Sequence, residues 1–127
     1  MAAPNIVNVT TITPHTVSIT PSDTSRNALV TAPSSGTAYK INQIIASNID
    51  GTSAVDATVE LRLADGTTYR AIGSTISVPA DASLIILDKT TMLYLMDTSV
   101  TGEASTLWAT SGTASKLTFT CSYEAIT

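Results

Sequence analysis

This chain of 127 residues has little charge, few aromatic residues and a single cysteine. Charged residues make up 13% of the chain and aromatic residues 5%. One cysteine excludes an internal disulfide. The six basic residues are scattered, so the basic patch that nucleic-acid binding requires is missing. No apolar run reaches the roughly 18 to 20 residues that span a bilayer, and the first residues lack a signal-peptide pattern. We expect no nucleic-acid partner, no membrane, and synthesis in a cytoplasm.

Hydroxyl residues are what the chain has in abundance. It contains 23 threonines and 15 serines, which together occupy 38 of the 127 positions. Threonine is β-branched and fits the pleated surface of a sheet. A surface of hydroxyl groups can pack against other protein without the desolvation cost that buried charges carry. This composition, with a net charge of -4, favours one β-rich domain that contacts other protein.

The last residues of the chain give the clearest local pattern. Leu117, Phe119, Cys121 and Tyr123 alternate with hydroxyl or charged residues. Alternation of this kind is typical of a β-strand with one buried face and one wet face. It predicts that Cys121 is a small core residue and not a nucleophile.

Short extended runs separated by turns fill the rest of the chain, and no helical periodicity is present. The candidate strands are Ile6 to Ile12, Thr16 to Thr20, Asn27 to Thr31, Tyr39 to Ser47, Ala54 to Leu63, Thr67 to Ile72, Thr75 to Val78, Leu84 to Leu87, Leu93 to Leu95, Ser105 to Ala109 and Leu117 to Ile126. Eight or nine of these are expected to form ladders. Asp65-Gly66 predicts a tight hairpin with positive φ values. The spacing of the runs predicts an all-β, antiparallel β-sandwich or jelly roll.

The first 35 residues differ from the rest because they hold four of the five prolines. Proline is confined to edges and starts of strands. Residues 1–35 are therefore expected to form either edge strands or an extended arm that pairs with a neighbour, and residues 36–127 to form the β-sandwich domain.

Candidate sites are few. His15 is the only histidine and Cys121 the only cysteine, too few for a zinc site or a nucleophilic triad. Six aspartates fall mostly in loops, where calcium binding competes with ordinary turn formation, and we favour turns: Asp50, Asp56, Asp65, Asp81, Asp88 and Asp97. We predict no catalytic, metal or cofactor-binding residue and no enzyme.

Trp108 is the one aromatic residue that invites a binding hypothesis. Together with Tyr39, Tyr69 or Tyr94 it could form a sugar-binding platform. A single tryptophan beside Leu107 is more often a core or interface residue. Both interpretations stay open from the sequence.

Several segments in one order resemble a family of small bacteriophage virion proteins, frequent in phages of cyanobacteria and other marine bacteria. The similar segments are Tyr39 to Asn48, the Asp65-Gly66 hairpin with Tyr69, Ile76 to Leu84, Leu93 to Leu95 and Ser122 to Glu124. The chain departs from the family after Leu95, where Met96-Asp97-Thr98 replaces a Glu-Gly-Asp turn. The resemblance implies a component of the virion, made in the host cytoplasm, and implies no catalytic residue.

Two functions follow from these observations. The first is a head decoration or cement protein that binds the major capsid protein or other virion proteins, as a homo-oligomer and most simply a trimer. The second is a neck, tail or fibre component, with host-surface glycan as a candidate ligand. An enzyme lacks a visible acid, base, metal or cofactor site.

Overall fold

A computed structural model describes residues 10–127. These residues form nine strands and no helix. The strands are β1 (Ile12–Ile19), β2 (Asn27–Val30), β3 (Ala38–Asn48), β4 (Val55–Leu63), β5 (Tyr69–Val78), β6 (Ser83–Leu87), β7 (Leu93–Leu95), β8 (Ala104–Ser111) and β9 (Leu117–Ile126). The predicted run from Ile6 to Ile12 begins outside the described residues, which start at residue 10.

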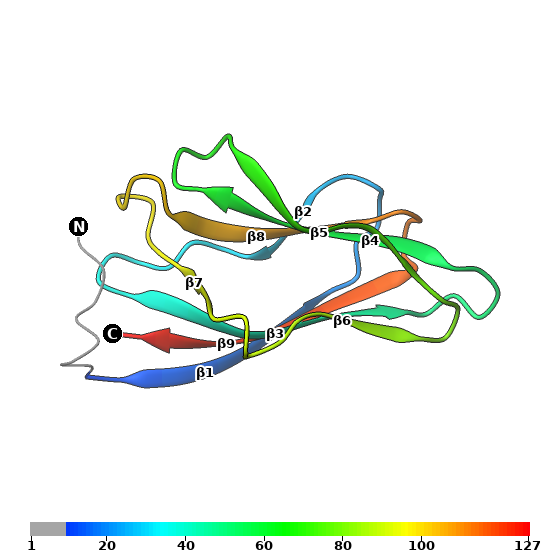
Figure 1. The fold of residues 1–127 in the computed structure, drawn as a ribbon, viewed down its shortest axis with the longest axis horizontal. Coiled ribbons are helices and arrows are strands. Elements are labelled where there is room, and N and C mark those ends of the chain that lie inside the picture. The colour runs from blue at the N-terminus through cyan, green and yellow to red at the C-terminus, as the bar shows by residue number, and fades with distance from the viewer. Residues whose placement is uncertain (1–9) are drawn as a thin grey trace.

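The strands form two antiparallel sheets that face one another (Figure 1). One sheet has the order β1-β9-β3-β6, with the short β7 also paired to β3, and is the lower layer in Figure 1. The other sheet has the order β2-β8-β4-β5 and forms the upper layer. The all-β sandwich that the sequence predicts is confirmed.

The strand order identifies the sandwich as a jelly roll. Successive partners run inward from both ends of the chain: β1 pairs with β9, β2 with β8, β3 with β6, and β4 with β5. The chain is thus one long antiparallel ribbon folded over itself. Adjacent pairs in the ribbon alternate between the two sheets, which is the arrangement of a double-sheet jelly roll.

The core lies between the sheets and is built by alternation along each strand. In β9, Leu117, Phe119 and Cys121 are fully buried, while the residues between them are only partly buried. Leu107 and Val59 supply the facing layer from β8 and β4. The predicted alternation of the last strand, with Cys121 in the core, is confirmed.

The first described strand shows how a proline fits inside a ladder. The sequence predicts separate runs ending at Ile12 and starting at Thr16, but β1 continues through Pro14. Thr11 and Thr127 exchange backbone hydrogen bonds, so alternate residues from Thr11 onward face β9. Pro14 therefore turns its nitrogen toward the open edge of the sheet, where no ladder donor is lost.

The β4–β5 hairpin forms where Asp65-Gly66 predicts it, but with a wider turn. Leu63 donates its amide hydrogen to the carbonyl of Thr68, 2.9 Å away. Only Gly66 of the pair has a positive φ, of 75°. Asp65 instead accepts hydrogen bonds from the amides of the following threonines, so its contribution is a capping carboxylate and not a left-handed backbone.

The segment up to residue 35 contributes an edge strand to each sheet: β1 lies beside β9, and β2 lies beside β8. Leu29 and Val30 of β2 are buried in the core. The division into residues 1–35 and 36–127 stays a prediction, and residues 1–9 of the first part lie outside the described chain.

Candidate functional site

His15 and Cys121 lie on neighbouring strands, and neither is arranged as a catalytic group. Cys121 is fully buried, and burial raises the pKa of its thiol to about 12. A nucleophilic thiol requires the opposite shift. His15 stacks on Tyr123, with ring centroids 5.1 Å apart, and Tyr39 contacts the same tyrosine at 4.6 Å. Burial also raises the pKa of Tyr123. These rings form a packing contact at one end of the sheet.

The loop aspartates are held by their own turns. Asp50, Asp65, Asp88 and Asp97 each accept hydrogen bonds from the amide and hydroxyl of a serine or threonine two or three residues later. The hydroxyl and amides of Thr67 and Thr68 lower the pKa of Asp65 to about 2, with the Thr68 hydroxyl the largest cause. Within residues 10–127, no three metal-ligating side chains gather at one point. The part of the chain that the structure describes forms no helix that could span a membrane.

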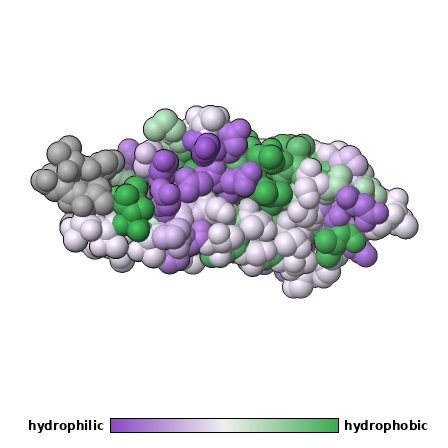
Figure 2. Space-filling model, turned by 90° about the horizontal axis from the view of Figure 1, so that it is seen from below, coloured by the Kyte–Doolittle hydropathy of each residue, from purple (hydrophilic) through white to green (hydrophobic). Residues whose placement is uncertain are grey.

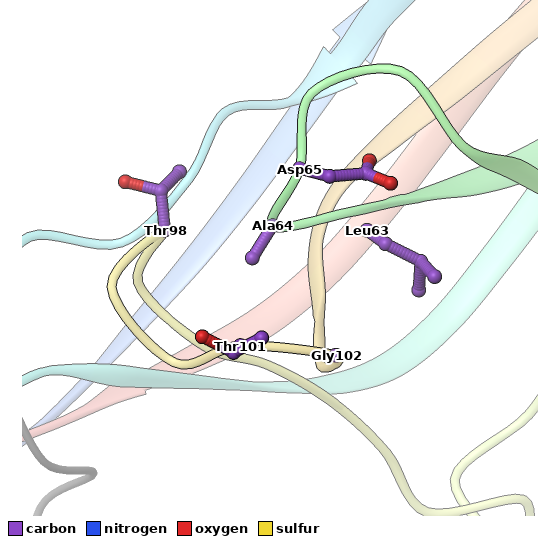
Figure 3. Close-up of a pocket in the computed structure, with 6 residues that line it drawn as sticks. All are labelled: Leu63, Ala64, Asp65, Thr98, Thr101 and Gly102. Carbon is purple, nitrogen blue, oxygen red and sulfur yellow. The ribbon is translucent and has the colours of Figure 1, made fainter.

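A small hollow lies between the β4–β5 hairpin and the loop that precedes β8 (Figure 3). Its volume is about 280 Å³, and it is lined by Leu63, Ala64, Asp65, Thr98, Thr101 and Gly102. The Asp65 carboxylate points away from Thr98 in Figure 3 and is bound within its own turn. The one carboxylate that lines the hollow is therefore already bound by its own turn.

The outer face of the β1-β9-β3-β6 sheet is lined with hydroxyl groups. We call it the hydroxyl face and define it by Thr16, Ser18, Thr20, Ser47, Ser83, Thr118, Thr120 and Ser122. These residues pair across strands, with oxygens 3.3 Å apart for Thr16 and Ser122 and 2.8 Å apart for Thr20 and Thr118. Ser47 and Ser83 pair in the same way at 2.9 Å.

An apolar pair sits within the hydroxyl face. Ile45 opposes both Thr120 and Ile85, and Ile85 is 57% exposed. The charged residues of this face at β3 and β9 are Lys40 and Glu124, which are opposite in sign and adjacent in register. From below, Figure 2 shows pale areas, the hydropathy of serine and threonine, beside a continuous purple area near the centre and several green areas.

The outer face of the β2-β8-β4-β5 sheet has a different chemistry. Arg26 binds Glu60 through two parallel hydrogen bonds, of 2.8 and 3.2 Å, and stacks on Tyr69 with 3.9 Å between its guanidinium carbon and the ring centroid. Arg62 lies 4.9 Å from the centroid of Trp108. We call these five residues the Arg–aromatic cluster. Its two arginines and one glutamate give it a charge of +1.

The cluster revises the expectation of a sugar platform. Trp108 and Tyr69 meet edge to face, with centroids 6.0 Å apart, while Tyr39 and Tyr94 lie in the other sheet. Arginine side chains already cover the ring faces on which a sugar would stack. Glycan binding by this chain stays a prediction from the sequence.

The arginines and glutamate of the cluster are residues that the sequence analysis missed. Alternation along β4 places Glu60 and Arg62 on one face, and the Asp65-Gly66 hairpin brings Tyr69 opposite Arg62. That part was accessible from the sequence. Arg26 was not, because its position depends on the long-range pairing of β2 with β8.

Among known proteins, the chain is similar to solved structures only. No protein-family model matches the chain. No curated protein matches it either. A chain from the infectious bursal disease virus Gx strain aligns with 90% of this chain at 16% identity and a TM-score of 0.43. The Gt strain aligns with 89% at 14% identity and a TM-score of 0.37. The VP2 subviral particle of the same virus aligns with 89% at 19% identity and a TM-score of 0.34.

The chain spans about a third of the length of these viral chains, with 32% or 33% of each covered. Its class rests on its own topology: the chain is an all-β jelly-roll domain with two chemically distinct outer faces.

Proposed function

We propose that this protein is a structural component of a bacteriophage virion and acts as a head decoration or cement protein. The jelly roll is a fold that viral capsid domains use, among other proteins. A fold does not define a function. The order of sequence segments that resembles small phage virion proteins supports the virion among the functions that this fold serves.

The observation that carries the proposal is the hydroxyl face. A contact made through Thr120, Ser122 and their neighbours would bury hydroxyls that already hydrogen-bond to one another. Such groups lose less on desolvation than isolated charges. The exposed Ile85 supplies an apolar anchor within the same face. Each contact is weak, but repetition over a capsid lattice gives high avidity when several copies are linked.

Linkage of copies is part of the proposal. We infer a homo-oligomer, and first a trimer, because a trimer matches the threefold positions of an icosahedral lattice. Sedimentation of the purified protein tests this inference. A single 13.1 kDa species at working concentration would contradict it.

The decisive experiment is the copy number of this chain in purified virions, measured by quantitative mass spectrometry. Hundreds of copies per particle would support a head decoration protein. A handful of copies, in multiples of three, six or twelve, would instead support the neck, tail or fibre alternative. Absence from the particle would overturn both.

A binding experiment tests the hydroxyl face itself. Thr120→Lys places a charge in the centre of the face, and Ala114→Lys places the same charge in the exposed loop between β8 and β9. We expect the first variant to bind particles that lack this protein at least tenfold more weakly, and the second to bind like the natural protein. Equal binding by both variants would exclude the hydroxyl face as the contact.

A further inference from the structure

The Arg–aromatic cluster contains one arginine, Arg62, with a hydrogen-bond donor that is not used. The Nε of Arg62 is buried and has no hydrogen-bond partner among the described residues. Its guanidinium contacts the rings of Trp108 and Tyr69 at 4.9 and 6.0 Å. Aromatic faces attract the charge but do not accept the in-plane hydrogen bonds of the guanidinium. A buried donor without a partner is rare and costly in a native fold.

The neighbouring arginine shows what such a group binds on this face. Arg26 uses its Nε and one terminal nitrogen to hold both oxygens of Glu60. Parallel hydrogen bonds of this kind between arginine and a carboxylate are strong and directional. Glu60 is committed to Arg26, so the cluster holds one carboxylate for two guanidinium groups.

Composition and charge together define the partner. Tryptophan, tyrosine and arginine are the residues that most often dominate the energy of protein interfaces. The cluster has a charge of +1, within a chain of net charge -4. We propose that the outer face of the β2-β8-β4-β5 sheet is a docking surface for an acidic segment of another protein, whose carboxylate binds the guanidinium of Arg62 beside the Arg26–Glu60 pair.

This inference does not depend on the proposed function. It concerns the opposite face of the sandwich, and its test uses the purified protein without virions. If the protein also decorates a capsid, the two faces would contact two different partners. Failure of either experiment leaves the other interpretable.

Trp108 is the only tryptophan of the chain, so its fluorescence reports on this site directly. The experiment titrates the full-length protein with a synthetic hexaglutamate peptide, with hexaglutamine as the uncharged control. We expect a saturable change in Trp108 emission with hexaglutamate and none with hexaglutamine. No saturable change with hexaglutamate would overturn the proposal, as would an identical response to inorganic phosphate at equal concentration.

Variants locate the effect at Arg62. Arg62→Gln should raise the hexaglutamate midpoint at least tenfold, because a charge-assisted pair of hydrogen bonds is lost. Lys89→Gln removes one charge from an exposed loop elsewhere and should leave the midpoint unchanged. Arg62→Lys keeps the charge and most of the side-chain packing but not the planar fork, and should weaken binding several-fold. If circular dichroism shows that Arg62→Gln is unfolded, the Arg62→Lys variant tests the role of Arg62 in its place. Equal weakening in Arg62→Lys and Lys89→Gln would contradict the assignment.

Discussion

Replacement of Cys121 tests whether the core of this jelly roll treats its only thiol as a small apolar group. Cys121 is fully buried in β9, opposite Val17 of β1 and Ile44 of β3. Cys121→Ala removes about one methylene equivalent and leaves a small cavity, which costs about 1 kcal/mol. Cys121→Ser keeps nearly the same volume but buries a hydroxyl without a partner, which costs about 1 to 3 kcal/mol.

These energies translate into melting temperatures through the entropy of unfolding. At about 2.1 cal/mol/K per residue, a chain of this length has an unfolding entropy of roughly 0.27 kcal/mol/K. One kcal/mol therefore corresponds to about 4 °C. We expect Cys121→Ala to melt about 4 °C below the natural protein, and Cys121→Ser about 4 to 11 °C below it. Differential scanning calorimetry measures both.

The matched control is Ser122→Ala, one residue along the strand on the hydroxyl face. Ser122 is partly exposed and its hydroxyl pairs with that of Thr16. Loss of such a surface contact should change the melting temperature by less than about 2 °C. A Cys121→Ser variant that melts within about 2 °C of the natural protein would refute the reasoning, because a buried hydroxyl would then carry no penalty. Reaction of the native thiol with a disulfide reagent at pH 8 would contradict a pKa raised to about 12.

Three further predictions follow from the turns and edges. The pKa of Asp65 is lowered from 3.8 to about 2, so its hydrogen bonds stabilise the fold above pH 3.8 and lose that effect as the pH falls toward 2. The urea midpoint of Asp65→Asn should therefore depend less on pH across this window than the midpoint of the natural protein. Gly66→Ala forces a side chain into a φ of 75° and should cost about 1 kcal/mol by calorimetry, although nothing lies within 4 Å of the new carbon. Deletion of residues 1–35 removes the buried Leu29 and Val30, whose burial contributes about 3 to 6 kcal/mol to the free energy of unfolding. We expect the shortened chain to show no cooperative melting by circular dichroism. A cooperative transition would show that residues 36–127 fold alone.

The elements that could be predicted from the sequence are those fixed by local chemistry. The alternation from Leu117 to Tyr123 determines which side of β9 is buried, whatever its neighbours are. The Asp65-Gly66 pair places the β4–β5 turn for a similar reason, since its glycine accepts a positive φ.

The features that could not be predicted depend on pairing between distant segments. Pro14 interrupts a strand in the sequence but not in the fold, because its nitrogen faces an open edge that only the β1–β9 register defines. Arg26 joins Glu60 across 34 positions of sequence for the same kind of reason. Strand order also follows from long-range pairing, which is why the sequence left sandwich and jelly roll open.

The two outer faces of the domain arise from one property of its strands. Each strand gives alternate residues to the core, so its remaining residues are free to carry a surface chemistry without disturbing the packing. In β9 these residues are Thr118, Thr120 and Ser122, whose hydroxyls pair with hydroxyls of β1 and of Thr20, the residue that follows it. In β4 they are Glu60 and Arg62, which meet Trp108 of β8. Because the two faces share the core but no surface residue, a substitution at Thr120 should leave binding at Arg62 unchanged, and this independence is what a protein that contacts two partners requires.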